Sequence, residues 1–316
     1  MAAPTIRMNN GLHIPVFGLG TWQASPGEVG EAVKNAIECG YRHIDCAHFY
    51  GNEKEIGQAI REKIEDGTVK RENLFITSKL WNNSHRPDLV IPACKRSLAD
   101  FGLEYLDLYL VHWPFAYAEE TGDLLPTDES GKIIGSDVDY LDTWKEMEHC
   151  VKSGLVKSIG MSNFNTEQID RLLQVATIKP VTNQVEVHPY MNNKKLVAFC
   201  KDKDITVTSY FPLGSPSRPW AKPDEPVLLE DPKLREIAKS YNKSIAQIIL
   251  RYLVDIGTIP VPKSSNKERM RMNIDIFDFE LSPEDIKLID TFNRNFRINQ
   301  AERDIHLKYY PFGIEY

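Results

Sequence analysis

The residues of this 316-residue sequence that could carry out chemistry follow short apolar runs. Asp45 follows His43-Ile44, Lys79 follows a run that ends at Ser78, and His112 follows Leu108–Val111. Other polar residues stand within or just after similar runs: Ser162, Asn163, Gln184, His188, Tyr210 and Lys263. If these runs are the parallel strands of one barrel, their carboxyl ends converge on a single mouth, where such barrels place their active sites. The pattern favours an active site made of ionisable and hydrogen-bonding groups.

Each of these residues also has an ordinary structural interpretation. Asp45 could cap a helix, Lys79 could pair with a surface carboxylate, His112 could be a hydrogen-bonded core histidine, and Tyr50 could anchor a loop. Their convergence favours function over these alternatives. A glycine-rich nucleotide loop is not indicated, because Gly18-Leu-Gly-Thr-Trp-Gln23 lacks the third glycine of the dinucleotide fingerprint. Any nucleotide must therefore be held in another way.

Eight short apolar runs, separated by amphipathic segments, are expected to be the strands that position these residues. They lie around Leu19, His43–Asp45, Leu74–Ser78, Leu106–Val111, Lys157–Met161, Val181–Val187, Thr206–Ser209 and Thr258–Val261. Before them, Asn9-Asn10-Gly11 is typical of a tight hairpin turn. Since no linker interrupts the pattern, we expect residues 1–316 to form a single α/β domain. Its predicted fold is a (β/α)8 TIM barrel with an N-terminal β-hairpin and a C-terminal loop extension.

Capping residues predict where helices begin and end. Ser25 is expected to cap the first helix with Glu28 completing a capping box, and Gly40 is expected to end it in a left-handed conformation. Two later helices should begin similarly, at Asn165-Thr-Glu-Gln168 and at Ser282-Pro-Glu-Asp285.

Composition and charge exclude several classes of protein. Hydrophobic residues make up 42% and charged residues 26%, as in a globular protein with a sizeable core. The net charge of -7, without a dense basic block, argues against binding to nucleic acid or to an anionic membrane surface. No apolar run approaches the ~20 residues needed to cross a bilayer, and Met1–Arg7 lacks the apolar stretch of a signal peptide. We therefore expect a cytoplasmic protein. Its five scattered cysteines predict neither a disulfide framework nor a zinc-thiolate site.

Five stretches resemble the aldo-keto reductase family, and most strongly its aldose reductase and aldehyde reductase branch. They are Gly40-Tyr-Arg-His-Ile-Asp-Cys-Ala-His-Phe-Tyr-Gly-Asn-Glu53, Ser78-Lys-Leu-Trp81, Asp107-Leu-Tyr-Leu-Val-His-Trp-Pro114, Gly160-Met-Ser-Asn-Phe164 and Ile259-Pro-Val-Pro-Lys-Ser264. The similarity extends from about Ile6 to Phe312, nearly the whole chain. It implies the barrel fold, a monomer, and the reduction of small aldehydes and ketones to alcohols with NADPH.

The resemblance implies a catalytic tetrad of Asp45, Tyr50, Lys79 and His112. Tyr50 would protonate the carbonyl oxygen while the cofactor delivers hydride to carbon. Because a tyrosine with a reference pKa of about 10 is a reluctant acid, the Lys79 ammonium would ease release of its proton. Asp45 would keep Lys79 charged and oriented, and His112 would donate a hydrogen bond to the carbonyl oxygen.

By the same resemblance, NADPH would lie across the mouth of the barrel. Ser162, Asn163 and Gln184 would hold the carboxamide, and Tyr210 would stack on the nicotinamide ring. The adenosine 2′-phosphate would meet Lys263, Ser264, Arg269 and Asn273, where two cations favour NADPH over NADH. The remaining expected cofactor contacts are Gly20, Thr21, Trp22, Leu213 and Ser215, the last two in a long segment, Pro212–Asp231, that would fold over the pyrophosphate.

The sequence departs from the family at three places. Asn266 and Met272, with Arg271 beside them, replace the residues expected near the adenine. Ser217 replaces an acidic residue of the loop over the cofactor, so looser closure is expected. Phe49 stands where a smaller Val is common, which should narrow the pocket.

Aromatic residues are expected to line the substrate pocket: Trp22, Phe49, Trp81, Trp113 and Phe115, joined by Asn299. Such walls suit an apolar aldehyde or ketone. A second long segment, Pro114–Asp139, is also expected to be a binding loop. The C-terminal stretch Asn295–Asp304 does not match aldose reductase closely, so sugars, lipid aldehydes, retinal and ketosteroids all stay open as substrates.

The sequence leaves two alternatives of other classes. A metal-dependent barrel hydrolase would need three or more His and carboxylate ligands at strand ends, but no H-x-H pair is present and no metal is expected. A cofactor-binding regulatory or structural protein could share the fold, yet an intact tetrad argues against it. A ketosteroid-type or sugar-selective reductase is the alternative within the family.

Overall fold

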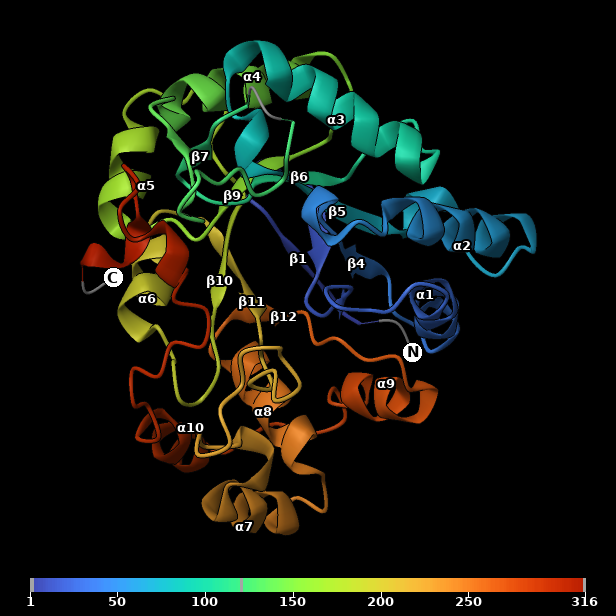
Figure 1. Ribbon diagram of the computed structural model, residues 1–316. Helices are drawn as coiled ribbons and strands as arrows, with labels where there is room; N and C mark the ends of the chain where they lie inside the picture. Colours follow the sequence, from blue (N-terminus) through green and yellow to red (C-terminus); the bar gives the residue numbers. More distant parts are fainter. Residues whose placement is uncertain (1–2, 120–121, 315–316) are drawn as a thin grey trace.

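Eight parallel strands curl into one barrel in the computed structural model, which describes residues 3–119 and 122–314 (Figure 1). They are β3 (Leu19–Gly20), β4 (His43–Asp45), β5 (Phe75–Leu80), β6 (Leu108–Val111), β9 (Ile159–Ser162), β10 (Thr182–Glu186), β11 (Thr206–Tyr210) and β12 (Thr258–Pro260). Each strand pairs with the next of these in the chain. All eight predicted strands are therefore confirmed.

The barrel closes between its first and last strands. The Gly18 amide donates to the carbonyl oxygen of Pro260 at 3.1 Å, and the Gly20 amide donates to that of Pro262 at 3.1 Å. A β-carbon on Gly20 would lie 2.6 Å from the carbonyl oxygen of Val261, so glycine is required for this approach. The predicted (β/α)8 barrel is confirmed.

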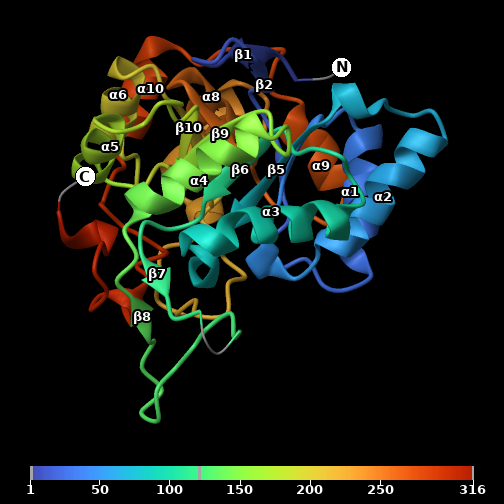
Figure 2. The same ribbon diagram turned by 90° about the horizontal axis from the view of Figure 1, so that it is seen from above.

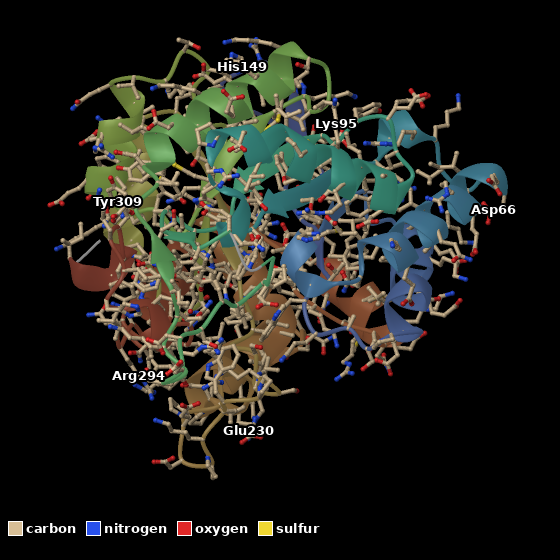
Figure 3. All side chains as sticks on the ribbon, turned by 45° about the horizontal axis from the view of Figure 1, so that its top comes forward. Asp66, Lys95, His149, Glu230, Arg294 and Tyr309 are labelled. Carbon is tan, nitrogen blue, oxygen red and sulfur yellow. The ribbon has the colours of Figure 1, made fainter. Side chains whose placement is uncertain are left out.

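Helices surround the barrel (Figures 1 and 2). They are α1 (Glu28–Glu38), α2 (Glu53–Glu65), α3 (Pro87–Phe101), α4 (Tyr140–Lys152), α5 (Thr166–Leu173), α6 (Lys194–Asp202), α7 (Pro232–Ser240), α8 (Ile245–Asp255), α9 (Lys267–Ile274) and α10 (Pro283–Asp290). Their outer faces are polar: Lys95 of α3 and His149 of α4 are exposed (Figure 3). None of the helices in the described parts of the chain combines the length and apolarity that crossing a membrane requires.

Helix α1 begins differently from the prediction. Its N-cap is Gly27, with φ at 83°, and no side chain caps it locally. Glu55 of α2 instead accepts hydrogen bonds from the amides of Gly27, at 3.1 Å, and Gly30, at 2.8 Å. The predicted capping box of Ser25 and Glu28 is wrong, because a carboxylate from the neighbouring helix satisfies the free amides.

The other predicted helix signals are confirmed. Gly40 follows the end of α1 with φ at 100°. Asn165 forms a capping box with Gln168, and the Ser282 side chain accepts from the amide of Asp285.

The N-terminal hairpin closes the base of the barrel. Strands β1 (Thr5–Arg7) and β2 (His13–Pro15) pair antiparallel, as predicted. Asn9 in the turn donates to the carbonyl oxygens of Pro180, at 2.8 Å, and Asp204, at 2.9 Å, just before β10 and β11. Met8 and Ile14 pack with residues of the barrel interior: Phe75, Leu108, Leu110, Val181 and Ile259. The amino-terminal end of the barrel is thereby plugged.

Three long segments lie at the opposite end. Residues 114–139 contain a short hairpin that the sequence did not predict, β7 (Ala116–Tyr117) with β8 (Gly135–Ser136). Residues 212–231 are irregular except for the 3-10 turn at Leu228–Glu230, and the C-terminal segment has 3-10 turns at Glu302–Asp304 and Pro311–Gly313. In Figure 2 the hairpin and the red C-terminal segment lie on the same side of the barrel.

Candidate active site

A cavity of about 1150 Å³ opens at the carboxyl ends of the strands. Most of the predicted site residues line it: Gly20, Thr21, Trp22, Asp45, Phe49, Tyr50, Trp81, His112, Trp113, Ser162, Asn163, Gln184, Tyr210, Leu213, Ser215, Lys263, Ser264, Arg269, Asn273 and Asn299. Lys79 lies behind the wall, fully buried. The strand-end pattern thus brings its residues to one mouth, with one exception: His188 does not line the cavity but is buried beside Glu186.

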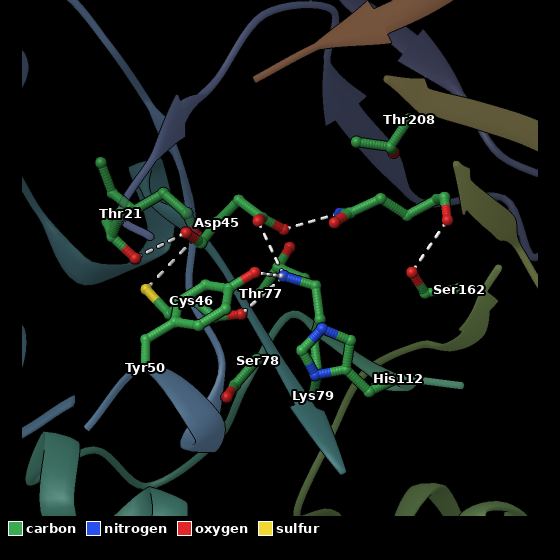
Figure 4. A network of polar contacts seen from close by, with 12 residues as sticks. Thr21, Asp45, Cys46, Tyr50, Thr77, Ser78, Lys79, His112, Ser162 and Thr208 are labelled. Atoms are coloured by element: carbon green, nitrogen blue, oxygen red, sulfur yellow. Dashed lines mark hydrogen bonds and ion pairs between the residues drawn. The ribbon is translucent and has the colours of Figure 1, made fainter. Parts of the chain in front are cut away.

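Three residues of the predicted tetrad form one hydrogen-bonded cluster (Figure 4). Lys79 Nζ donates to Asp45 Oδ2 at 2.7 Å, to the carbonyl oxygen of Cys46 at 2.9 Å, and to Tyr50 Oη at 3.3 Å. The other carboxylate oxygen of Asp45 accepts from Gln184 Nε2 at 2.7 Å. The carboxylate of Asp45 and the carbonyl oxygen of Cys46 therefore hold the buried ammonium next to the Tyr50 hydroxyl.

Neighbouring strands and one short turn create this arrangement. Asp45 ends β4 and pairs in register with Thr77 of β5, two residues before Lys79. After β4, the 3-10 turn His48–Tyr50 folds the chain back, and Gly51, with φ at 68°, ends it. The Tyr50 ring consequently lies over the end of β5, with its centroid 5.9 Å from that of His112.

Burial and charge set the protonation states of the cluster. Burial by itself lowers the pKa of Lys79, but Asp45 and Tyr50 outweigh it, so this pKa is raised and the ammonium stays charged. Burial raises the pKa of Tyr50 to about 12, against the lowering effect of Lys79. The cation therefore limits the rise without reversing it, a smaller effect than the sequence suggested. Tyr50 is a protonated phenol at neutral pH.

His112 is a neutral imidazole at the cavity wall. Burial, reinforced by Lys79, holds its pKa well below the usual value. Its Nδ1 atom is buried and has no hydrogen-bond partner among the described residues. In Figure 4 the ring lies beside Lys79 and Tyr50. A neutral ring can still donate one hydrogen bond to an oxygen in the cavity.

The amide and hydroxyl groups of three further side chains lie next to this cluster. Ser162 Oγ donates to the carbonyl oxygen of Gln184 at 2.8 Å, and Asn163 Nδ2 donates to that of His112 at 3.0 Å. Tyr210 Oη donates to Asn163 Oδ1 at 2.8 Å. Asn163 has φ at 62°, a left-handed conformation that Asn tolerates better than most residues.

A positive patch borders the cavity around the start of α9. Lys263 and Arg269 are exposed there, and neither forms an ion pair with another described residue. Asn266, expected near an adenine, caps α9 by accepting from the amide of Arg269 at 2.9 Å. Met272 lines the cavity. A helix N-terminus flanked by cations is a favourable place for a phosphate.

The segment 212–231 covers one side of the cavity. The ring of Trp220 packs on that of Trp22, with centroids 5.6 Å apart, and its Nε1 donates to the carbonyl oxygen of Ile298 at 3.2 Å. The buried Arg218 pairs with Glu225 and donates to the carbonyl oxygen of Ser215 at 3.3 Å. The segment thus joins the barrel to the C-terminal tail.

Further aromatic rings line the cavity, with one correction to the prediction. Phe49 stacks on Trp81 with centroids 3.8 Å apart, and the edge of Trp81 meets His112 at 5.1 Å. Phe115 does not line the cavity: it is fully buried, because Trp113 stacks over it at 5.2 Å. Tyr117, which the sequence reasoning missed, lines the cavity instead.

Glu186, also missed, holds the C-terminal segment against the barrel. This fully buried carboxylate accepts from the amides of Ile298, at 2.6 Å, and Asn299, at 2.8 Å. His188 Nε2 lies 3.0 Å from it. The signal was present, since a charged residue inside the apolar run Val185-Glu-Val187 requires buried partners.

Comparisons with known proteins agree along nearly the whole chain. A family model described as "Aldo/keto reductase family" matches residues 16–294. "Aldo-keto reductase family 1 member A1-A" of Danio rerio is 52% identical over 295 residues, covering 93% of this chain and 90% of that protein. "Aldo-keto reductase family 1 member A1" of Mus musculus is 46% identical over 327 residues, covering 100% of both.

Solved structures are similar over the same length. The aldose reductase from Schistosoma japonicum superposes with a TM-score of 0.93 at 46% identity, covering 99% of this chain and 100% of that one. The Bombyx mori aldo-keto reductase in complex with NADP gives a TM-score of 0.89 at 43% identity, covering 98% and 99%.

Proposed function

Because the chain belongs to the aldo/keto reductase family, we propose that it reduces aldehydes and ketones to alcohols with NADPH, with Tyr50 as the general acid. The observation that carries the proposal is the 3.3 Å hydrogen bond from Lys79 Nζ to Tyr50 Oη at the wall of the cavity. A phenol held on a buried, paired ammonium can give up its proton to an oxygen in the cavity and be stabilised as it does so.

The residues present fit a reduced nicotinamide dinucleotide. Ser162, Asn163 and Gln184 offer the amide and hydroxyl groups that a carboxamide needs, and Tyr210 offers a ring for stacking. When bound, the cofactor supplies hydride. Lys263 and Arg269, with Ser264 and Asn273, would hold the 2′-phosphate. This patch supports NADPH over NADH, because only NADPH carries the extra anion.

Proton transfer is assigned to the chain's own groups. Tyr50 donates its proton to the carbonyl oxygen, and the Lys79 hydrogen bond then stabilises the phenolate. Asp45 keeps the ammonium charged, and its bond from Gln184 fixes its orientation. His112, being neutral, donates a hydrogen bond that orients the carbonyl. Among the described residues, Tyr50 carries the only hydroxyl group that is hydrogen-bonded to Lys79.

Tyr50→Phe tests the acid directly. We expect kcat for an aromatic aldehyde with NADPH to fall by about 10²–10⁴-fold, the usual contribution of a general acid. Affinity for NADPH, titrated separately, should be unchanged, because the hydroxyl does not belong to the groups assigned to the cofactor. Equal turnover by the two proteins would rule out Tyr50 as the acid. Running NADH in parallel measures the expected preference for the phosphorylated cofactor.

A non-catalytic protein on this fold is the second candidate. It predicts cofactor binding without turnover of any aldehyde, sugar or ketosteroid. The wall of Phe49, Trp81 and Trp113 favours turnover of apolar carbonyl compounds over sugars. A substrate panel with NADPH separates these outcomes.

A further inference from the structure

A buried carboxylate that has no part in the proposed reaction lies on the outer side of β5. Glu53, the first residue of α2, is only 3% exposed. Its Oε1 accepts from Ser78 Oγ at 2.5 Å, and its Oε2 accepts from Ser97 Oγ at 3.0 Å. Ser78 belongs to β5 and Ser97 to α3. A buried charge needs such partners, and here they join three elements at one carboxylate.

The bond from Ser78 reaches the strand that carries Lys79. Successive side chains of a strand point to opposite faces, so Lys79 enters the mouth of the barrel while Ser78, one residue earlier, points toward the helices. In Figure 4 the Ser78 hydroxyl points away from the Lys79 ammonium. Glu53 is therefore bonded to the residue next to the one that holds the phenol.

The same carboxylate directly follows the turn that carries Tyr50. Glu53 is three positions after Tyr50 in the sequence, and His48 Nδ1, at the start of the turn, lies 3.5 Å from Glu53 Oε2. On the other side, Asn52 Nδ2 donates to the carbonyl oxygen of Thr21, just after β3, at 3.0 Å. Strands β3 and β5 flank β4. The turn after β4 is thus fastened to both neighbours, by Asn52 to β3 and by Glu53 to β5.

We infer that Glu53 is a positioning residue for the proposed acid: its hydrogen bond from Ser78 sets the distance between the Tyr50 hydroxyl and the Lys79 ammonium. The inference rests on the proposed carbonyl reduction. The bond to Tyr50, at 3.3 Å, is the longest of the three that the ammonium donates, so a displaced turn weakens it first. A displacement of about 1 Å can cost about a hundredfold in rate.

Ser97 provides a matched control. Ser78→Ala and Ser97→Ala each remove one hydroxyl from the same carboxylate, and both serines are fully buried. If Glu53 served stability alone, the two variants would lose similar stability and keep similar rates. A positioning role predicts similar losses of stability in urea but unequal rates, because the Ser97 bond leads to α3 and not to the strand of Lys79.

The rate to measure is that of hydride transfer in a single turnover of benzaldehyde with NADPH, since product release can limit kcat. Ser78→Ala should lower this rate about tenfold, as for a partly misplaced acid. Ser97→Ala should leave it nearly unchanged. The benzaldehyde concentration at half-saturation and the affinity for NADPH should not change in either variant, because neither serine lines the cavity.

Two changes at Glu53 separate the hydrogen bond from the charge. Glu53→Gln keeps an oxygen that can accept from Ser78 and gains an amide that can donate to Ser97, so it should retain most of the rate. Glu53→Ala loses both bonds and should lower the rate at least as much as Ser78→Ala.

A double variant tests whether the effect passes through the acid. In a Tyr50→Phe protein, Ser78→Ala should lower the residual rate no further, because the hydroxyl through which it acts is already missing.

Hydrogen exchange of residues 48–52 gives a readout independent of turnover. The amides of Tyr50 and Gly51 are bonded within the turn, to the carbonyl oxygens of Ala47 and His48. Ser78→Ala should speed their exchange, and Ser97→Ala should not.

Four results would each overturn the inference: equal rates in the two serine variants, a Glu53→Gln rate as low as that of Glu53→Ala, a further fall in the Tyr50→Phe protein, or unchanged exchange of the turn in Ser78→Ala. If the unmodified protein does not reduce benzaldehyde, the proposed function fails. The exchange measurement then still decides whether the Ser78 bond holds the turn.

Discussion

Lys79 can remain charged inside the protein because its neighbours replace water. A carboxylate, a carbonyl oxygen and a phenol take its three donors, at 2.7, 2.9 and 3.3 Å. The same contacts explain why Tyr50 is not strongly acidic: burial penalises its phenolate more than the cation favours it. The phenol thus keeps its proton until an acceptor oxygen arrives.

The pH profile of the forward reaction should reflect this balance. Tyr50 must be protonated to act, and its pKa is raised to about 12, so kcat should stay level between about pH 7 and 9, well below the pKa. It should decline only as the pH approaches that value. Lys79→Met removes the opposing cation and should move the break upward while lowering kcat. A break near pH 7 in stopped-flow hydride transfer would contradict this assignment.

At the scale of elements, what could be predicted depended on how local the determining contacts are. The strands were predictable because buried parallel strands are continuous apolar runs, and the helix starts at Asn165 and Ser282 because a residue three positions on completes the contact. The start of α1 was not predictable, because its free amides are hydrogen-bonded by Glu55, which lies 25 residues from Gly30 in the sequence. The β7–β8 hairpin was missed since the C-terminal segment, remote in sequence, packs against it.

The predicted cap of α1, Ser25, and the observed partner of its first amides, Glu55, lead to opposite expectations for the stability of two variants. Glu55→Ala should lower the free energy of unfolding by about 1 kcal/mol, as for other lost helix caps. Ser25→Ala should change it by no more than about 0.5 kcal/mol, because no capping bond is lost. Urea denaturation of both variants measures the difference. The reverse order would restore Ser25 as the cap.

At the scale of the whole molecule, barrel closure places the residues of the site. Asp45, Lys79 and His112 could be placed at one mouth from sequence because each lies at or near the end of a strand and closure brings strand ends together, whereas Tyr50, in the turn after β4, was joined to them only by the family resemblance. Phe115 and Tyr117 could not be placed, since their surroundings depend on long segments that meet only in the folded barrel. For Glu186 the sequence showed a charge within an apolar run but not its partners, which lie in the C-terminal segment.

Closure itself should be sensitive to one carbon atom. Gly20→Ala would place a β-carbon 2.6 Å from the carbonyl oxygen of Val261, just after the last strand, and we expect a loss of about 2 kcal/mol in unfolding free energy, typical of overpacking. Gly313→Ala, where a β-carbon meets nothing within 4 Å, is the control and should be nearly neutral. Calorimetry of both variants suffices. Equal melting temperatures in the two variants would mean that the contact between the first and last strands accommodates the added carbon at little cost.

The placement of the tryptophans has an optical consequence. Of the five in the chain, Trp22, Trp81, Trp113 and Trp220 border the cavity, and Trp144 alone is enclosed in the hydrophobic core. A molecule that binds in the cavity therefore changes the surroundings of one or more of these four indole rings. The tryptophan fluorescence of the unlabelled protein should therefore change when the cavity is filled, while the contribution of Trp144 stays constant.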